Sequence, residues 1–183
     1  KVDQVELIKA IGRLNIPTKV FNVLASCYVS PQFKIKDCCG KSEYRKQRTG
    51  IRQGCPLSPY LFILLMAIMF HDIHEKLDHE IRNGKLDHFN YHELLYADDT
   101  LIIGKRGKEI NKILKEVETE SARYNMKLNR GKCNHIDMNC NEKILFANGE
   151  IVKPLDKAIY LGGTITERAL KTAELQTRLT KAL

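Results

Sequence analysis

Residues 93–103 read ELLYADDTLII, in which an acidic pair separates two apolar runs. Such runs on both sides of a polar dipeptide predict a hairpin with Asp98 and Asp99 at its turn. Adjacent carboxylates repel each other unless a cation lies between them, and Mg²⁺ binds carboxylate oxygens together with substrate phosphates. The pair is therefore a candidate metal site, although an ordinary acidic turn is the simpler interpretation of two aspartates alone.

Two helices are predicted around this hairpin. Upstream, Ser58 as N-cap and Pro59 at the first helical position predict a helix over 58–77 that carries the apolar run LFILLMAIMF. Downstream, residues 108–124 have the spacing of a strongly amphipathic helix. Its predicted buried face consists of Ile110, Ile113, Leu114, Val117 and Tyr124.

The start of the chain predicts two further helices and a basic hairpin. Residues 3–14 have helical spacing, and Pro17 opens a second helix. Residues 33–37 alternate as a strand, Gly40-Lys41 is the predicted turn, and residues 43–48 return as the second strand. The second helix is expected to bury an apolar stripe of Val20, Phe21, Leu24 and Cys27.

The end of the chain continues the mixture of strands and helices. Asn148-Gly149 predicts a two-residue turn between 144–146 and 151–152. Residues 160–165 have the pattern of another strand, and Thr166 can cap a last helix over 167–183. Intermixed helices, strands and tight hairpins predict the α+β class.

The composition favours a globular domain without a membrane-spanning segment. The 183 residues include 43% hydrophobic residues, which is typical of a globular domain. The longest apolar run is about half of the ~20 residues that a bilayer span needs, so we expect no membrane segment. The chain opens on Lys1 without an initiator Met or a signal peptide, which suggests a piece of a longer protein located in the nucleus or cytoplasm.

The six cysteines are expected to be reduced thiols, because no secretory signal accompanies them. Zinc is the alternative. Cys133, His135 and Cys140 are the nearest set, but their spacing does not match the paired C-x2-C of a structural site. His71 and His74 are one helical turn apart, and two histidines alone do not make a structural zinc site.

Positive charge is concentrated in two places. The net charge is +8, from 30 basic and 22 acidic residues. Clusters of basic residues bind the phosphate backbone of a nucleic acid through counterion release, or they form an ordinary solvated surface. The first cluster is Lys41, Arg45, Lys46, Arg48 and Arg52, and the second is Lys127, Arg130 and Lys132.

Four motifs in order resemble the reverse transcriptase family. The sequence YADD at 96–99 resembles the catalytic hairpin, and RQGCPLSPYLF at 52–62 resembles the second palm motif of the non-LTR retrotransposon and group II intron types. MKLNRGK at 126–132 resembles the next palm motif, and YLG at 160–162 resembles the hairpin that grips the primer. The resemblance covers nearly the whole chain.

The resemblance implies a right-hand polymerase palm with part of the fingers and a truncated thumb. Residues 1–50 would be fingers and palm, 51–166 the palm, and 167–183 the start of the thumb, all within one domain. The implied activity is RNA-directed DNA synthesis with two Mg²⁺ ions, or Mn²⁺ in their place. The implied partners are an RNA template, a DNA primer and deoxynucleoside triphosphates.

The resemblance also implies residue roles. Asp98 would bind the metal that activates the primer 3′-hydroxyl, Asp99 would support it, and Lys132 would assist the leaving pyrophosphate. Tyr96 can also be a core aromatic, and Arg52 an ordinary surface residue. The expected nucleotide and template contacts are Arg52, Gln53, Gly54, Tyr96 and Ala97; the primer grip is Leu161 and Gly162; the backbone contacts are Lys41, Arg45, Lys46 and Arg48.

The chain also departs from the family pattern. The motif with the third metal-binding aspartate is expected just before Lys1, so we expect residues 1–183 alone to be inactive. Asn125 stands where the family usually has glycine, and asparagine tolerates a positive φ. A non-catalytic RNA-binding remnant is the alternative function. An RNA-directed RNA polymerase is disfavoured by Ala97, because that class usually has glycine there.

Overall fold

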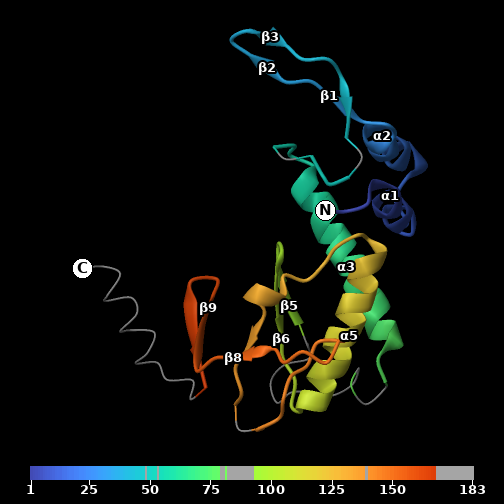
Figure 1. The fold of residues 1–183 in the computed structure, drawn as a ribbon. Coiled ribbons are helices and arrows are strands. Elements are labelled where there is room, and N and C mark those ends of the chain that lie inside the picture. Colours follow the sequence, from blue (N-terminus) through green and yellow to red (C-terminus); the bar gives the residue numbers. More distant parts are fainter. Residues whose placement is uncertain (48, 53, 79–80, 82–92, 139, 168–183) are drawn as a thin grey trace. The chain divides into compact units, whose positions relative to one another are not determined.

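Helices and short strands alternate along the chain (Figure 1). The computed structural model describes residues 1–47, 49–52, 54–78, 81, 93–138 and 140–167, and the structural statements below concern these residues. They belong to two units. The first comprises Lys1–Leu77, Leu95–Thr100 and Glu116–Lys127, and the second comprises Asp78–Leu94, Leu101–Lys115 and Leu128–Leu183.

Three helices build most of the first unit: α1 (Gln4–Gly12), α2 (Thr18–Tyr28) and α3 (Ser58–Lys76). The predicted helices over 3–14 and 58–77 and the one opening at Pro17 are thereby confirmed, with ends shifted by one or two residues. α1 contacts both α2 and α3. Burial of their shared faces removes several complete side chains from water: Leu7, Ile11, Leu61, Leu65, Met69 and Ile73.

Two local predictions in this unit are wrong. Ser58 is not an N-cap, because it is the first helical residue and its Oγ donates a hydrogen bond back to the Arg52 carbonyl. The apolar stripe on α2 is not buried as a whole, because Val20 is 50% exposed. Phe21 explains the difference: its ring packs at the Gly12 position of α1, so α1 covers one side of α2 only.

Between α2 and α3 the chain forms a long basic hairpin, here called the arm (residues 31–47; Figure 1). Its base pairs β1 (Gln32–Phe33) with β4 (Arg45–Lys46), and its far end pairs β2 (Lys36–Asp37) with β3 (Gly40–Lys41), both antiparallel. The predicted hairpin is confirmed, but its turn is Cys38-Cys39 instead of Gly40-Lys41, because Asp37 pairs with Gly40.

Helix α5 (Gly107–Arg123) confirms the helix predicted over 108–124 and contributes residues to both units. At its end Asn125 has φ 55°, as its tolerance of positive φ allows. The Met126 N–H donates to the Ser121 carbonyl and the Asn125 N–H donates to the Ala122 carbonyl, which is the Schellman arrangement. The asparagine thus takes the place that glycine usually has.

The second unit has a small core where α5 meets the segment 144–152. Asn111 anchors that segment, because its side chain donates to the Lys143 carbonyl and accepts the Leu145 N–H. The turn predicted at Asn148-Gly149 is one residue longer: Phe146 N–H donates to the Glu150 carbonyl, and Gly149 has φ 84°. The buried cluster is Leu114, Ile144, Phe146 and Val152.

Short strand pairs complete this unit. β7 (Asn134–His135) is parallel to β8 (Lys153–Pro154), and β9 (Lys157–Tyr160) is antiparallel to β10 (Gly163–Thr166). The single strand predicted over 160–165 is therefore a hairpin turn with a strand on either side. The helix predicted over 167–183 lies almost wholly outside the described residues.

The described residues fit the α+β class, since helices accompany small, mostly antiparallel, two-stranded sheets. Among the same residues, no helix is both long and apolar enough to cross a lipid bilayer. The β5 (Glu93–Tyr96) and β6 (Asp99–Ile102) strands form the predicted hairpin, but its turn is Ala97-Asp98 instead of Asp98-Asp99, because Asp99 already belongs to β6.

Candidate active site

The acidic pair lies at an exposed tight turn. Ala97 and Asp98 connect β5 to β6, and Asp99 is the first residue of β6. Ala97 has φ 53°, a left-handed conformation that costs an L-residue about 1–2 kcal/mol. Both aspartates are exposed, so their carboxylates are available to a ligand from solution. A strained turn that presents two acids to solvent is typical of a functional site.

The donor chemistry of this turn suits Mg²⁺. Asp98 and Asp99 provide hard oxygen donors, and Mg²⁺ is commonly held by one or two carboxylates together with substrate phosphates. Among the residues that the structure describes, no group of three or more His, Cys, Asp or Glu side chains could hold a metal ion.

Tyr96 precedes the turn and is 62% exposed. The interpretation of Tyr96 as a core aromatic is therefore wrong. Its neighbours Leu94 and Leu95 are also well exposed, at 42% and 39%. An exposed aromatic residue thus precedes the two exposed aspartates in this hairpin.

The loop before α3 is anchored at its start and open at its centre. The Gly50 N–H donates to the Val2 carbonyl at 2.7 Å, and the Gly50 carbonyl accepts the Gln4 and Gln47 amides. Further along, Gly54 has φ 80°, and a Cβ built there would contact nothing within 4 Å. The backbone at Gly54 can therefore be approached closely, as predicted for a nucleotide-binding loop.

Two neighbours of Gly54 have defined partners. Arg52 is exposed, and its Nη2 donates to the Cys27 carbonyl at 3.1 Å, so the side chain is oriented by α2. The Leu57 backbone N–H, followed by Ser58 and Arg52, lowers the pKa of the Cys55 thiol. Gln53 lies outside the described residues.

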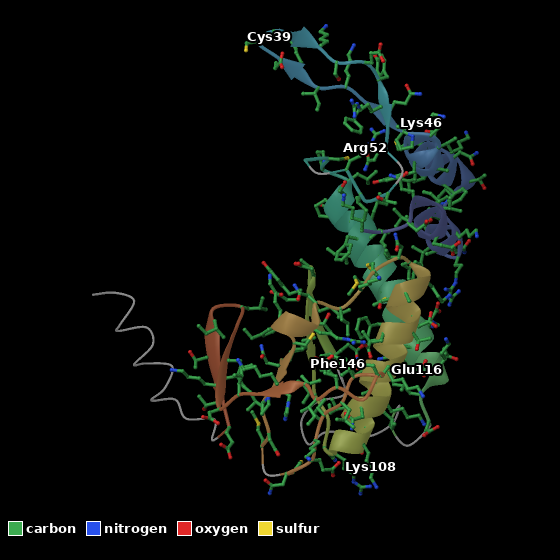
Figure 2. All side chains as sticks on the ribbon, viewed as in Figure 1. Cys39, Lys46, Arg52, Lys108, Glu116 and Phe146 are labelled. Atoms are coloured by element: carbon green, nitrogen blue, oxygen red, sulfur yellow. The ribbon has the colours of Figure 1, made fainter. Side chains whose placement is uncertain are left out.

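The arm exposes basic and aromatic side chains together. Lys41, Arg45 and Lys46 are all exposed on it, and Figure 2 shows Lys46 close to its base. Lys34 Nζ lies 4.7 Å from the centre of the Tyr44 ring, a cation–π contact. No role was predicted from the sequence for these aromatic side chains, although Phe33 precedes Lys34 and Tyr44 precedes Arg45. Arg48 lies outside the described residues.

The remaining predicted residues belong to the second unit. Lys132 is exposed in a short 3-10 turn, Arg130–Lys132. Leu161 and Gly162 form the two-residue turn between β9 and β10, with φ 49° and 81°, which matches a type I′ turn. Leu161 is 54% exposed, and Tyr160 Oη donates to the Leu94 carbonyl of β5. The structure therefore presents a strained, exposed leucine at the predicted primer grip.

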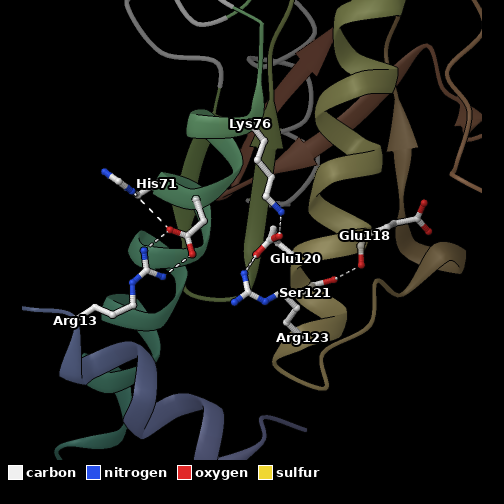
Figure 3. Close-up of polar contacts among 8 residues, drawn as sticks. Arg13, His71, Lys76, Glu118, Glu120, Ser121 and Arg123 are labelled. Atoms are coloured by element: carbon white, nitrogen blue, oxygen red, sulfur yellow. Dashed lines mark hydrogen bonds and ion pairs between the residues drawn. The ribbon is translucent and has the colours of Figure 1, made fainter.

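A buried carboxylate in the first unit was missed by the sequence patterns (Figure 3). Glu120 on α5 is fully buried and forms ion pairs with Lys76 of α3 and with Arg123. Burial alone would raise the pKa of Glu120, but the hydrogen bonds from both cations outweigh it and the pKa is lowered. The same contact raises the pKa of Lys76.

A second ion pair connects α1 to α3. Arg13 donates two parallel hydrogen bonds to the Asp72 carboxylate, at 2.5 Å each. This bidentate contact lowers the pKa of Asp72 and raises that of Arg13. Both ion-pair clusters hold helices in place, and neither contains a residue of the acidic hairpin.

Comparison with known proteins supplies the family. The family model described as reverse transcriptase (RNA-dependent DNA polymerase) matches residues 1–165. The match includes the acidic hairpin, the Gly54 loop, the arm, Lys132 and the Leu161 turn. It extends over most of the 183 residues, and the chain therefore belongs to the reverse transcriptase family.

Proposed function

We propose that this chain carries the palm of an RNA-directed DNA polymerase encoded by a non-LTR retrotransposon or group II intron type of element. The observation that carries the proposal is the exposed pair of carboxylates at the β5–β6 hairpin, with Asp98 in a turn that has Ala97 at positive φ and Asp99 at the start of β6, in a chain of this family. The proposed substrates are a DNA primer, an RNA template and deoxynucleoside triphosphates.

In this reaction the primer 3′-oxygen forms a bond to the α-phosphorus, and the bond to pyrophosphate breaks. Asp98 and Asp99 would hold Mg²⁺ or Mn²⁺ there, two ions in the complete site, which neutralise developing charge on the phosphate oxygens. Lys132 is the proposed donor of a proton to the leaving pyrophosphate. The Gly54 loop and Tyr96 would contact the nascent base pair, and the Leu161 turn would support the primer.

Asp98 and Asp99 are adjacent carboxylates on a single hairpin. We therefore expect residues 1–183 alone not to extend a primer, since in-line transfer between two ions needs more ligands than this pair. Primer extension on an RNA template with the isolated chain measures this. Templated extension above background would contradict it.

The test of the site uses a longer, active protein that contains these residues. Asp98→Asn keeps the side-chain volume and removes the charge, so the extension rate should fall by roughly 10³ or more. Asp156→Asn is the matched control, because Asp156 is an exposed aspartate outside the acidic hairpin. An Asp98→Asn protein with more than about a tenth of the original rate would refute the assignment. If every longer protein that contains these residues binds RNA but extends no primer, the non-catalytic alternative is supported instead.

The arm is the proposed path for the nucleic-acid backbone. Its cations are exposed and therefore free to contact phosphates, and contacts of this kind do not depend on base sequence. Phe33 and Tyr44, which are 45% and 65% exposed, would add stacking surfaces for unpaired bases. The arm therefore combines charge and aromatic surface, as a polymerase that accepts any template requires.

A further inference from the structure

We propose that Cys38 and Cys39 form a binding site for a trivalent arsenical, held by bonds to both sulfurs. The two cysteines are exposed at the turn of the arm, and Figure 2 shows Cys39 at the arm's free end. Neither residue belongs to the proposed polymerase chemistry. The proposal rests on the geometry of the turn and is independent of the proposed function.

The turn itself brings the two sulfurs together. Side chains of consecutive residues point to opposite faces of a strand, so adjacent cysteines are normally separated. Here Asp37 pairs with Gly40, and the cysteines are the two connecting residues of the hairpin. Asp37 Oδ1 accepts the Cys39 N–H at 2.8 Å, and Gly40 at φ 142° completes the turn. The result is a distance of 3.7 Å between the two Sγ atoms.

That distance suits one atom bridging the sulfurs. It is too long for a disulfide, whose sulfurs are about 2.05 Å apart, and both thiols are free. With bonds of about 2.3 Å to each sulfur, which is the length of a zinc–thiolate bond and close to that of an arsenic–thiolate bond, the angle between the two bonds is about 107° across 3.7 Å. This is close to the bond angle at a tetrahedral or pyramidal centre, so chelation requires little movement of the turn.

The number of donors selects the class of ligand. A structural zinc ion needs four protein ligands, but no third His, Cys, Asp or Glu joins the two cysteines in any metal-binding group of the described residues. A monosubstituted trivalent arsenical needs only two sulfurs, because carbon occupies its third position. The pair of thiols therefore matches an organoarsenical better than it matches zinc.

The other cysteines differ in geometry. Cys27, Cys55 and Cys133 are half-buried, and Cys133 Sγ donates to the Asn129 carbonyl. Cys140 is exposed, but its Sγ donates to the Lys105 carbonyl at 3.0 Å. Cys140 is thus the matched single-thiol control for the arm.

The probe is phenylarsine oxide, added to the full 183-residue chain. Two arsenic–sulfur bonds form while the arsenic–oxygen bond breaks, and the oxygen leaves as water with the two thiol protons. No oxidation or reduction occurs. The expected product has one bridging phenylarsenic per chain by intact mass, and peptide mapping should place it on the peptide that contains both cysteines.

Cys38→Ser and Cys39→Ser should each weaken binding by about 100-fold or more, because the second bond forms intramolecularly at high effective concentration. Cys140→Ser should bind as the unmodified chain does. Serine at an exposed turn should leave the far-ultraviolet circular dichroism unchanged. The proposal would be overturned if Cys38→Ser or Cys39→Ser bound phenylarsine oxide as tightly as the unmodified chain does. An adduct that maps to any other cysteine of the unmodified chain would also overturn it.

Discussion

Substitutions at Glu120 and at its two cations will measure how a buried charge between α3 and α5 affects the free energy of unfolding. The Glu120 side chain is fully buried, whereas its partners Lys76 and Arg123 have side chains that are 45% and 54% exposed. Water can therefore solvate the cations without Glu120, but it cannot solvate Glu120 without the cations. The order of the mutational effects follows from this asymmetry.

Replacing both Lys76 and Arg123 by Met leaves an unpaired buried carboxylate and should lower the free energy of unfolding by about 3–5 kcal/mol. Glu120→Leu removes the buried charge and leaves two solvated cations, so it should cost less, about 1 kcal/mol. Glu6→Gln is the control, because the exposed Glu6–Lys9 pair should contribute at most about 0.5 kcal/mol.

The assay is urea denaturation at neutral pH, followed by far-ultraviolet circular dichroism with tyrosine fluorescence as a second probe. Coincident transitions would show that one free energy describes the change. The reasoning would be refuted if Glu120→Leu were as destabilising as the double cation variant, because burial of the charge would then not decide the effect.

Three further outcomes follow from the same structure. The cations lower the pKa values of Glu120 and Asp72, so the unfolded chain binds more protons in acid than the folded chain does. The contribution of the two carboxylates to the free energy of unfolding is therefore present above the unfolded pKa of about 4 and is lost as the pH falls through the lowered folded values. Urea midpoints between pH 7 and 3 will measure this loss, which should be shallower in Glu120→Leu. Asn125→Gly should leave thermal stability unchanged or higher, whereas Asn125→Ala should cost about 1 kcal/mol because of the φ of 55°; equal stability of the two would contradict the Schellman assignment. In an active parent protein, replacing Arg45, Lys46 and Arg48 by Ser should make the plot of log affinity for an RNA–DNA hybrid against log salt shallower by roughly 2, and equally so for unrelated sequences. The same change at Lys143, Lys153 and Lys157 is the control for non-specific loss of charge. An unchanged slope in the first variant would mean that the arm is only a solvated surface.

The sequence by itself was sufficient for features that depend on neighbouring residues. Apolar spacing located α1 and α5, Pro59 and the apolar run after it located α3, and the two apolar runs around Asp98-Asp99 located the β5–β6 hairpin. The resemblance to a family that usually has glycine at this position, together with the tolerance of asparagine for positive φ, predicted the turn at Asn125. These features could be predicted because turns and the apolar pattern of a helix are set within a few residues of the chain.

The tertiary structure decided which side chains meet and which are buried. Glu120 follows Ile113 and Val117 at helical spacing, so its position on the apolar face was visible, but its burial depends on Lys76, 44 residues away in the chain. The predicted burial of the apolar stripe on α2 was wrong because only one side of that helix is covered by another element. Cys38 and Cys39 became a dithiol only because the register of β2 and β3 placed both in the turn. Burial and register depend on contacts between distant segments, which a local pattern does not contain.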